Sequence, residues 1–275
     1  MSSERYSPVG SGLPIPLRER LAGGGWLRTA HRGAPTVAPG NSRRAIVAAT
    51  NLGVDIVEVD IHRTADGHLV LWHDDTLTIN GARIPLATAT MAALQAVDIG
   101  QGEHIISLTD GLDTVRGHAA LLIDLKADGL AEQIIETVRA CGEQPVMVCG
   151  RFWESLREIT RRAPEIGTSL TLGYNWRRQY GDDVIERIDT VAVTVDWRIL
   201  DPGFVTRCHA RGLAVLAWTV DDLSLMRQLL AMGVDGLTSN RPDLFAQAGL
   251  MGSRFEVRGL KKPDSEPRTP NPEPG

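Results

Sequence analysis

The chain has 275 residues, of which 43% are hydrophobic and 23% charged, so it can bury the core of one α/β barrel. Its net charge of −5 argues against a protein that binds nucleic acid through a basic face. The sequence holds no apolar run of the roughly 18–20 residues needed to span a bilayer, so no transmembrane segment is expected.

The two ends of the chain differ in composition from its middle. Residues 1–25 lack the apolar segment of a secretory signal and are predicted to form a flexible arm. Residues 251–275 are rich in proline and charge, and we expect a disordered tail there. Residues 26–250 are predicted to form a single domain. The sequence has three cysteines, namely Cys141, Cys149 and Cys208. An odd number without a CxxC pair favours a reduced, cytoplasmic protein.

Short β-branched runs alternate with amphipathic segments of helical length. The expected strands are 26–30, 55–61, 68–72, 120–125, 145–148, 168–172, 190–195, 213–218 and 236–238. The expected helices are 42–52, 130–140, 153–162, 201–211 and 222–232. Repeated strand–helix alternation predicts a parallel sheet, and about eight such units favour a (β/α)8 barrel, the TIM-barrel fold, over an open sheet. Because nine strands are expected for eight places, one of them is wrong or lies outside the barrel.

The active site of such a barrel lies at the carboxyl ends of its strands. Ionisable side chains stand at or near the ends of the first four expected strands. They are His31 and Arg32, Glu58 and Asp60, His73 and Asp74, and Asp124 and Lys126. Glu58 and Asp60 are two residues apart, as are Asp124 and Lys126, so strand alternation points both members of each pair to one face. The pattern therefore predicts that these groups meet at one rim.

Each of these residues also has a purely structural interpretation. A single histidine at a strand end is more often structural than catalytic, a Glu-x-Asp pair is often a solvated strand edge, and Lys126 could simply pair with Asp124. Three carboxylates in one mouth, however, would repel one another and raise one another's pKa unless a cation neutralised them. Glu58, Asp60 and Asp124 are therefore candidate ligands for Mg²⁺ or Ca²⁺, which prefer oxygen donors.

A divalent ion beside an arginine and a lysine suits the chemistry of a phosphodiester. Arg32 and Lys126 are candidate substrate-binding residues, because they can neutralise anionic phosphate oxygens. His31 and His73 are candidate catalytic residues. Histidine, with an unperturbed pKa of about 6.5, can act near neutral pH as the base for a nucleophile or as the acid for a leaving oxygen. The predicted binding partner is a small-molecule phosphodiester substrate. The sequence does not decide which of the two histidines is the base and which is the acid.

Four stretches, "AHRG", "EVDIHRTADGHLVLWHDDTL", "LIDLK" and "LAWTVDD…GVDG", occur in this order. They resemble the glycerophosphodiester phosphodiesterases, part of the phospholipase-C-like phosphodiesterase barrels, from about Ala30 to Pro242. The resemblance implies a TIM barrel, a Ca²⁺ or Mg²⁺ site at Glu58, Asp60 and the acidic residue of "LIDLK", and a histidine pair at the two positions named above. It also implies hydrolysis of glycerophosphodiesters to glycerol 3-phosphate and an alcohol, with the glycerol 2-hydroxyl as one possible first nucleophile.

The sequence departs from that family at three points. Gly40 stands where the family usually has the glutamate of "PENT", Asp124 where it has the glutamate of "IEIK", and Ser239-Asn240 where it has "TD". Aspartate is one methylene shorter than glutamate, and Mg²⁺ keeps waters in a compact octahedron, so Asp124 favours Mg²⁺ over Ca²⁺. An aspartate as the third metal ligand also makes the chain similar to the sphingomyelinase D enzymes of the same superfamily. The alternatives are therefore a lysophospholipase-D-like or sphingomyelinase-D-like enzyme, and a catalytically inactive barrel that binds phosphate esters.

Aromatic residues are also expected around the mouth. Those at or just after expected strand ends are Phe152, Trp153, Tyr174, Trp176, Trp197 and Trp218. Trp176 and Trp218 are candidate substrate-binding residues, and such a wall suits an alcohol that carries a choline, acyl or aryl group.

Two further features lie close to the expected site. His62 has the same strand parity as Glu58 and Asp60, but it lies beyond the expected end of the strand and is predicted to be a surface histidine. The segment between His73 and "LIDLK" has about the length of a helix pair plus a loop, and the resemblance to the family implies a small cap there.

Overall fold

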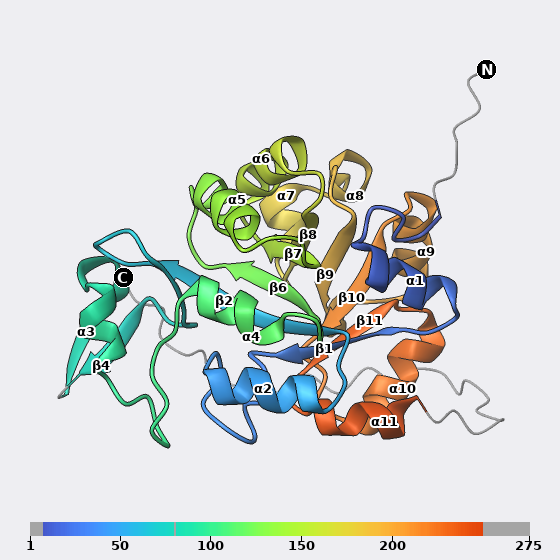
Figure 1. Ribbon diagram of the computed structural model, residues 1–275. Helices are drawn as coiled ribbons and strands as arrows, with labels where there is room; N and C mark the ends of the chain where they lie inside the picture. Colours follow the sequence, from blue (N-terminus) through green and yellow to red (C-terminus); the bar gives the residue numbers. More distant parts are fainter. Residues whose placement is uncertain (1–7, 80, 250–275) are drawn as a thin grey trace.

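The computed structural model describes residues 8–79 and 81–249, and the expected tail at 251–275 lies outside them. Eight parallel strands form a barrel (Figure 1). They are β1 (Leu27–His31), β2 (Ile56–Arg63), β6 (Ala120–Leu125), β7 (Val146–Gly150), β8 (Gly167–Leu172), β9 (Ala192–Asp196), β10 (Ala214–Trp218) and β11 (Gly236–Ser239). The barrel is closed because β1 pairs in parallel with both β2 and β11. The predicted (β/α)8 fold is confirmed.

The ninth expected strand, β3 (Leu69–Leu71), lies outside the barrel and pairs antiparallel with the end of β2. The turn between them is tight: the Thr64 N–H donates to the carbonyl of His68 at 2.9 Å, and Gly67 has a φ of 84°. So short a connection can join antiparallel strands, whereas parallel strands need a crossover of a dozen or more residues. The expectation that residues 68–72 form a barrel strand is therefore wrong.

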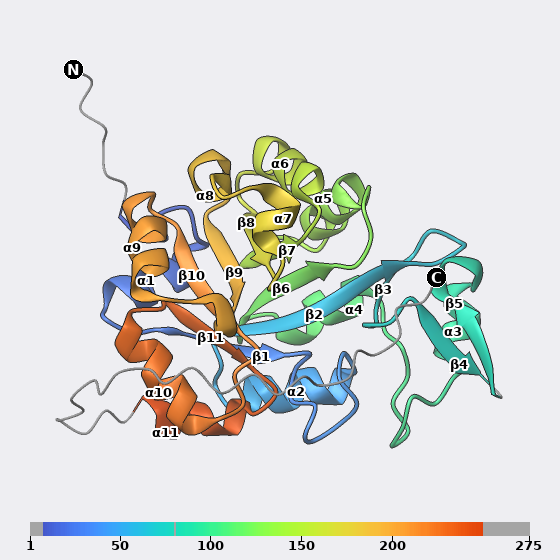
Figure 2. The ribbon, with the colours of Figure 1, turned by 180° about the vertical axis from the view of Figure 1, so that it is seen from behind.

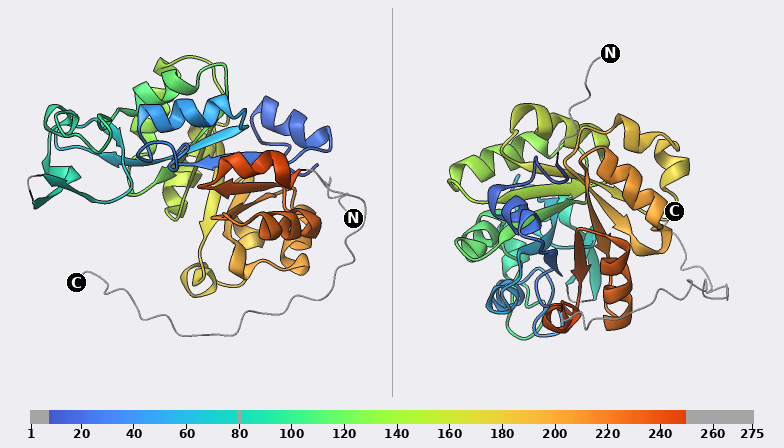
Figure 3. Two further views of the ribbon diagram at one scale, coloured as in Figure 1. Left: turned by 90° about the horizontal axis from the view of Figure 1, so that it is seen from below. Right: turned by 90° about the vertical axis from the view of Figure 1, so that its right-hand side faces the viewer.

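Helices surround the strands (Figure 3). The five expected helices are present as α2 (Arg43–Asn51), α5 (Ala131–Ala140), α6 (Trp153–Arg162), α9 (Pro202–Ala210) and α10 (Leu223–Met232). Side chains of Ser42, Asp201 and Asp222 cap the amino ends of three of them, as the sequence signals indicate. Shorter helices that the pattern did not indicate are α4 (Leu108–Val115), α7 (Trp176–Tyr180), α8 (Val184–Arg187), η2 (Trp197–Ile199), η3 (Pro242–Leu244) and α11 (Phe245–Ala248). Among the helices of residues 8–79 and 81–249, none combines the length and the apolar composition needed to cross a membrane.

Residues 8–25, predicted as part of a flexible arm, instead fold against the barrel. They include α1 (Ile15–Ala22), and the side chains of Leu13 and Leu17 are buried. Both leucines pack with apolar residues from the first positions of several strands, such as Leu27. The arm prediction is wrong here because these leucines cover the apolar amino-terminal end of the barrel and so gain the free energy of burial.

An insert between β3 and α4 lies to one side of the barrel (Figures 1 and 2). It contains β4 (Thr76–Ile79), β5 (Ala82–Pro85), η1 (Leu86–Thr88) and α3 (Met91–Gln95). Leu77, Leu86 and Leu94 of the insert form a separate apolar cluster with Val70 of β3. The insert lies in the segment where a small cap was expected, and it follows β2 and β3 in the chain.

Candidate active site

The stretch His31-Arg32-Gly33 turns the chain sharply at the end of β1. Arg32 and Gly33 have φ values of 57° and 79°, in the left-handed region that favours glycine. A Cβ atom at Gly33 would lie 2.5 Å from the carbonyl carbon of Ala45, so α2 approaches too closely for any other residue. In this conformation the backbone N–H of Arg32 donates to Glu58 Oε2 at 2.9 Å. The turn therefore delivers both an N–H and a guanidinium to the carboxylates of β2.

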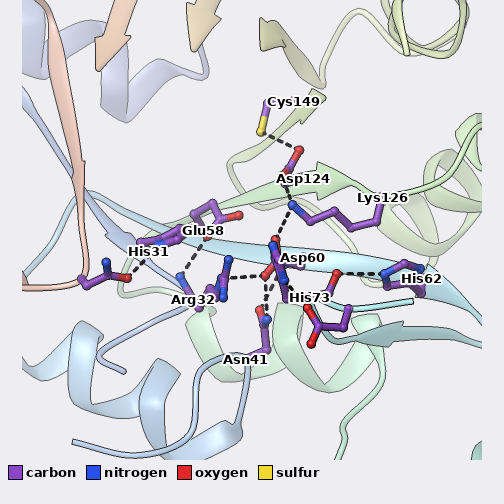
Figure 4. A network of polar contacts seen from close by, with 12 residues as sticks. His31, Arg32, Asn41, Glu58, Asp60, His62, His73, Asp124, Lys126 and Cys149 are labelled. Atoms are coloured by element: carbon purple, nitrogen blue, oxygen red, sulfur yellow. Dashed lines mark hydrogen bonds and ion pairs between the residues drawn. The ribbon is translucent and has the colours of Figure 1, made fainter. Parts of the chain in front are cut away.

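Strand register brings three carboxylates together (Figure 4). Asp60 of β2 is paired directly with Asp124 of β6, and Glu58 lies two residues earlier on the same face of β2. Oxygen atoms of the three side chains lie within 4.8 Å of one another. Glu58 and Asp60 are buried, and Asp124 is partly buried. The group predicted from the sequence is thus assembled by the parallel pairing of two neighbouring strands.

Two cationic side chains of the protein contact this cluster. Lys126 Nζ lies 2.7 Å from Asp60 Oδ1 and also pairs with Asp124 Oδ2. Arg32 Nε lies 3.0 Å from Asp60 Oδ2. Arg32 and Lys126, the predicted phosphate-binding residues, are therefore also ion-pair partners of the carboxylates. The pairing of Lys126 with Asp124, which the sequence left open as a structural alternative, is present.

The carboxylates of the cluster outnumber by one the cationic side chains that contact them. Burial, reinforced by Asp60 and Asp124, raises the pKa of Glu58 well above its ordinary value. Burial also raises the pKa of Asp124 despite the nearby Lys126. It would do the same to Asp60, but Lys126 and Arg32 hold the pKa of Asp60 below its ordinary value. Three carboxylates facing two cations form a set of oxygen donors that fits a hard divalent cation.

His31 lies beside Glu58, because β1 and β2 pair these two residues in register. Its Nδ1 lies 2.7 Å from Asn240 Oδ1, and its Nε2 lies 3.9 Å from Glu58 Oε2. Since an amide oxygen only accepts, Nδ1 carries the proton, and Nε2 of the neutral ring keeps its lone pair. Burial, together with the charge of Arg32, lowers the pKa of His31 and so favours this neutral form.

His73 reaches the same cavity from outside the barrel sheet. It lies in the loop after β3, so its expected origin at the end of a third barrel strand is wrong. Its Nδ1 donates to Asp74 Oδ1 at 2.6 Å. His73 and His31 both line a cavity of about 430 Å³ at the carboxyl end of the barrel. This volume suits a small ligand. The cavity is also lined by Arg32, Glu58, Asp124, Lys126, Arg151, Phe152 and Trp218.

The expected ring of aromatic residues is only partly present. Phe152 and Trp218 line the cavity. Trp176 does not: it is 1% exposed and packs edge-to-face on Phe204, with ring centroids 5.9 Å apart. The expectation that Trp176 borders the opening is wrong, because the first residue of α7 turns inward onto α9. With Trp176 in the core, the argument for a bulky apolar alcohol loses its main support.

His62 is not a surface histidine, and that prediction is also wrong. β2 continues to Arg63 instead of ending before His62, because β3 pairs with its last residues. His62 is 8% exposed, and its Nε2 lies 3.1 Å from the backbone carbonyl oxygen of His73 (Figure 4).

Two asparagines complete the site and were missed in the sequence. Asn41 donates from Nδ2 to Asp60 Oδ2 at 2.8 Å and accepts from the Asp60 N–H at 3.0 Å. Asn240 is held in turn by Asp221, which accepts from its backbone N–H at 2.7 Å and from its Nδ2 at 2.8 Å. The available signal was that both lie in segments where the sequence departs from the family. In the segment of Asn41, a Cβ added to the neighbouring Gly40 would lie 3.1 Å from Arg32 Cβ, so a larger residue would press on that arginine.

Comparison with known proteins agrees with this geometry. The model of the glycerophosphoryl diester phosphodiesterase family matches residues 31–119 and 123–244. The chain belongs to the glycerophosphoryl diester phosphodiesterase family. The resemblance inferred from the sequence motifs is confirmed, and with it the enzyme class, a phosphoric diester hydrolase.

Individual relatives match most of the chain. The protein named probable glycerophosphodiester phosphodiesterase 2 of Mycobacterium tuberculosis is 32% identical over 254 residues, which are 83% of this chain and 92% of the relative. A glycerophosphodiester phosphodiesterase of Caldanaerobacter subterraneus subsp. tengcongensis is 27% identical over 239 residues, covering 79% of this chain and 95% of the relative. A solved phosphodiesterase of Oleispira antarctica, in complex with the product sn-glycerol-3-phosphate, has the same fold. Its TM-score is 0.72 at 24% identity, covering 81% of this chain and 96% of that one.

The contact between Asn240 and His31 gives a testable prediction. Asn240→Ala removes the acceptor that orients the imidazole, and a misplacement of about 1 Å in an active site can lower a rate by about 10²-fold. We expect kcat for a glycerophosphodiester to fall about 10- to 100-fold with the thermal unfolding midpoint little changed. Asn51→Ala, at an exposed position on α2, is the control and should keep the wild-type rate. A wild-type kcat for Asn240→Ala would mean that this contact does not orient His31.

Proposed function

We propose that the protein hydrolyses small glycerophosphodiesters to glycerol 3-phosphate and an alcohol, with a divalent metal ion and with His31 and His73 as the acid–base pair. The observation that carries the proposal is one cavity of about 430 Å³ that both histidines line, beside three clustered carboxylates. The structural neighbour from Oleispira antarctica, which holds sn-glycerol-3-phosphate, and the names of the relatives support the same substrate class.

The metal ion is assigned to Glu58, Asp60 and Asp124. When bound, it would supply charge neutralisation for the phosphate and for the negative charge that develops during its hydrolysis. Asp60 is held for this role by Asn41, and Glu58 by the N–H of Arg32. We favour Mg²⁺ over Ca²⁺ because the short Asp124 side chain suits an ion that keeps waters in a compact octahedron.

The two histidines are assigned opposite roles from their hydrogen bonds. Asn240 holds the proton of His31 on Nδ1, so Nε2 is free to take the proton of the attacking hydroxyl, whether of water or of the glycerol 2-position. His73 is held at Nδ1 by Asp74, which leaves Nε2 to protonate the leaving alcohol. Both side chains line one cavity, so they can act on one phosphorus atom.

The remaining lining residues are assigned to the substrate. Arg32 neutralises the non-bridging phosphate oxygens with the two Nη atoms that its ion pair leaves free, and Lys126 with the third N–H of its Nζ. Phe152 and Trp218 pack against the alcohol. Both the volume of the cavity and the burial of Trp176 favour a small alcohol over a lipid.

We also propose a cytoplasmic location. All three cysteines, Cys141, Cys149 and Cys208, are free thiols, which is typical of a reducing compartment.

The function is tested by release of glycerol 3-phosphate from glycerophosphocholine with Mg²⁺, with Ca²⁺ and with EDTA. We expect turnover with Mg²⁺ and its loss in EDTA. His31→Ala and His73→Ala should each lower kcat about 10²- to 10⁴-fold, since positioned acid–base groups contribute factors of this size. The control is His118→Ala, a change of an exposed histidine that stands two residues before the start of β6 and does not line the cavity.

Three outcomes separate the alternatives. A histidine variant that keeps more than about a tenth of the wild-type rate is not the acid or the base. Choline release from a lysophospholipid in preference to glycerophosphocholine would favour a lipid-directed enzyme. Tight binding of glycerol 3-phosphate by a wild-type protein that turns over no diester would favour an inactive binding barrel.

Asp124 gives a separate prediction about the metal. Asp124→Asn removes one ligand charge and should raise the Mg²⁺ concentration needed for the half-maximal rate. Asp124→Glu restores the residue usual in the family and moves the carboxylate about 1–1.5 Å outward, so it should alter the ratio of Mg²⁺- to Ca²⁺-supported rates. Wild-type rates and an unchanged Mg²⁺ requirement in both variants would remove Asp124 from the metal site.

A further inference from the structure

His62 is a buried histidine for which the proposed reaction has no use. It lies on β2 two residues beyond Asp60, on the same face as Asp60 and Glu58, where the strand projects past the barrel toward the insert (Figures 1 and 4). Burying an imidazole is unfavourable unless its polar atoms find partners. Its Nε2 has one in the backbone carbonyl oxygen of His73, at 3.1 Å. Because a carbonyl oxygen only accepts, Nε2 is the donor in this contact.

His73 depends on such contacts more than His31 does. His31 is the last residue of a barrel strand, with β2 and β11 on either side of that strand. His73 lies in the loop between Leu71 and Thr76, and its side chain is 43% exposed. A proton donor in a loop needs fixed anchors if it is to stay within hydrogen-bond reach of a leaving oxygen.

Anchors of two kinds hold this loop. Trp72 fixes the residues on either side of His73: its backbone N–H donates to the carbonyl of Asp60 at 3.1 Å, and its Nε1 donates to the carbonyl of Thr76 at 3.1 Å. His62 contacts the peptide of His73 itself. His62 and Asp60 belong to the same strand, so this contact ties the position of His73 to the carboxylate cluster.

We infer that His62 is a positioning residue for the reaction: its Nε2–H fixes the peptide of His73 and thereby the distance between the His73 imidazole and the carboxylate cluster. The inference rests on the proposed role of His73 as the acid for the leaving alcohol. His62 itself touches neither substrate nor metal in this account. His62 affects the rate only by fixing the position of His73.

The test compares His62→Leu, which has no donor, with His62→Gln, whose side-chain amide can donate to the same carbonyl. We expect His62→Leu to lower kcat for glycerophosphocholine about 10- to 100-fold, with KM within about twofold, because a displacement of about 1 Å costs a factor of this order. His62→Gln should recover most of the rate. With the p-nitrophenyl ester of glycerol 3-phosphate, whose leaving group needs no protonation, the loss in His62→Leu should be severalfold at most.

A control comes from His104, a histidine of the insert whose side chain also contacts a backbone carbonyl. His104 Nδ1 lies 2.8 Å from the backbone carbonyl of Val97, on the exposed side. His104→Leu removes a contact of the same kind without touching the His73 loop, and it should keep the wild-type rate on both esters. The thermal unfolding midpoint of each variant shows whether a loss of rate reflects a loss of fold.

The outcomes separate the inference from the function on which it rests. If His73→Ala keeps its rate, the proposed role of His73 fails. If His73→Ala loses its rate while His62→Leu keeps the wild-type kcat, the role of His73 stands and the positioning inference is overturned. It is also overturned if His62→Leu and His62→Gln lose rate equally on both esters. The double variant His62→Leu/His73→Ala should be no slower than His73→Ala, and a much slower double variant would mean that His62 acts by another route.

Discussion

The structure is organised around one unfavourable arrangement: three carboxylates that lie within 4.8 Å of one another, two of them buried and one partly buried. Like charges this close cannot all stay ionised without positive charge nearby. The protein brings two cations of its own. Lys126 follows directly after β6, and Arg32 stands in a backbone conformation that non-glycine residues rarely adopt. The tight turn at Gly33, the close approach of α2 and the amide of Asn41 all hold groups that stabilise these carboxylates. Burial still raises the pKa values of Glu58 and Asp124, and this cost of ionising them is the physical reason for proposing a metal ion.

Strand register converts this cluster into a candidate active site. Parallel pairing sets Asp60 beside Asp124 and His31 beside Glu58, so a histidine and the carboxylates share one rim without any contribution from flexible loops. The second histidine arrives differently. β2 runs on past the barrel, turns back as β3 and places His73 over the cavity, and the same strand supplies both Asp60 and His62. The spacing between the two proposed proton-transfer groups is therefore set largely by β1 and β2.

The parts that could be predicted from the sequence were those with a local signal. β-Branched runs separated by amphipathic segments indicated the barrel, and alternation within "EVD" and "LIDLK" put the carboxylates on one face. Contacts between distant segments have no such signal. His31 and Asn240 are 209 residues apart, and nothing near either one indicates the other. His62 was misplaced because pairing with β3 lengthens β2. Trp176 was misplaced because a position after a strand end does not determine whether a side chain faces the cavity or the helices. The segment of α1 was expected to be flexible because its burial depends on the amino-terminal end of the barrel, which exists only once the barrel has formed.

The most direct test of the central claim is a calorimetric titration of the metal-stripped 275-residue chain with Mg²⁺ and, separately, with Ca²⁺. The account predicts saturable binding of one ion per chain, and the loss of that binding in Asp60→Asn and Glu58→Gln variants whose circular dichroism shows an intact fold. Binding of the same affinity in both folded variants, or no binding by the wild-type protein at concentrations up to about 10 mM, would contradict it.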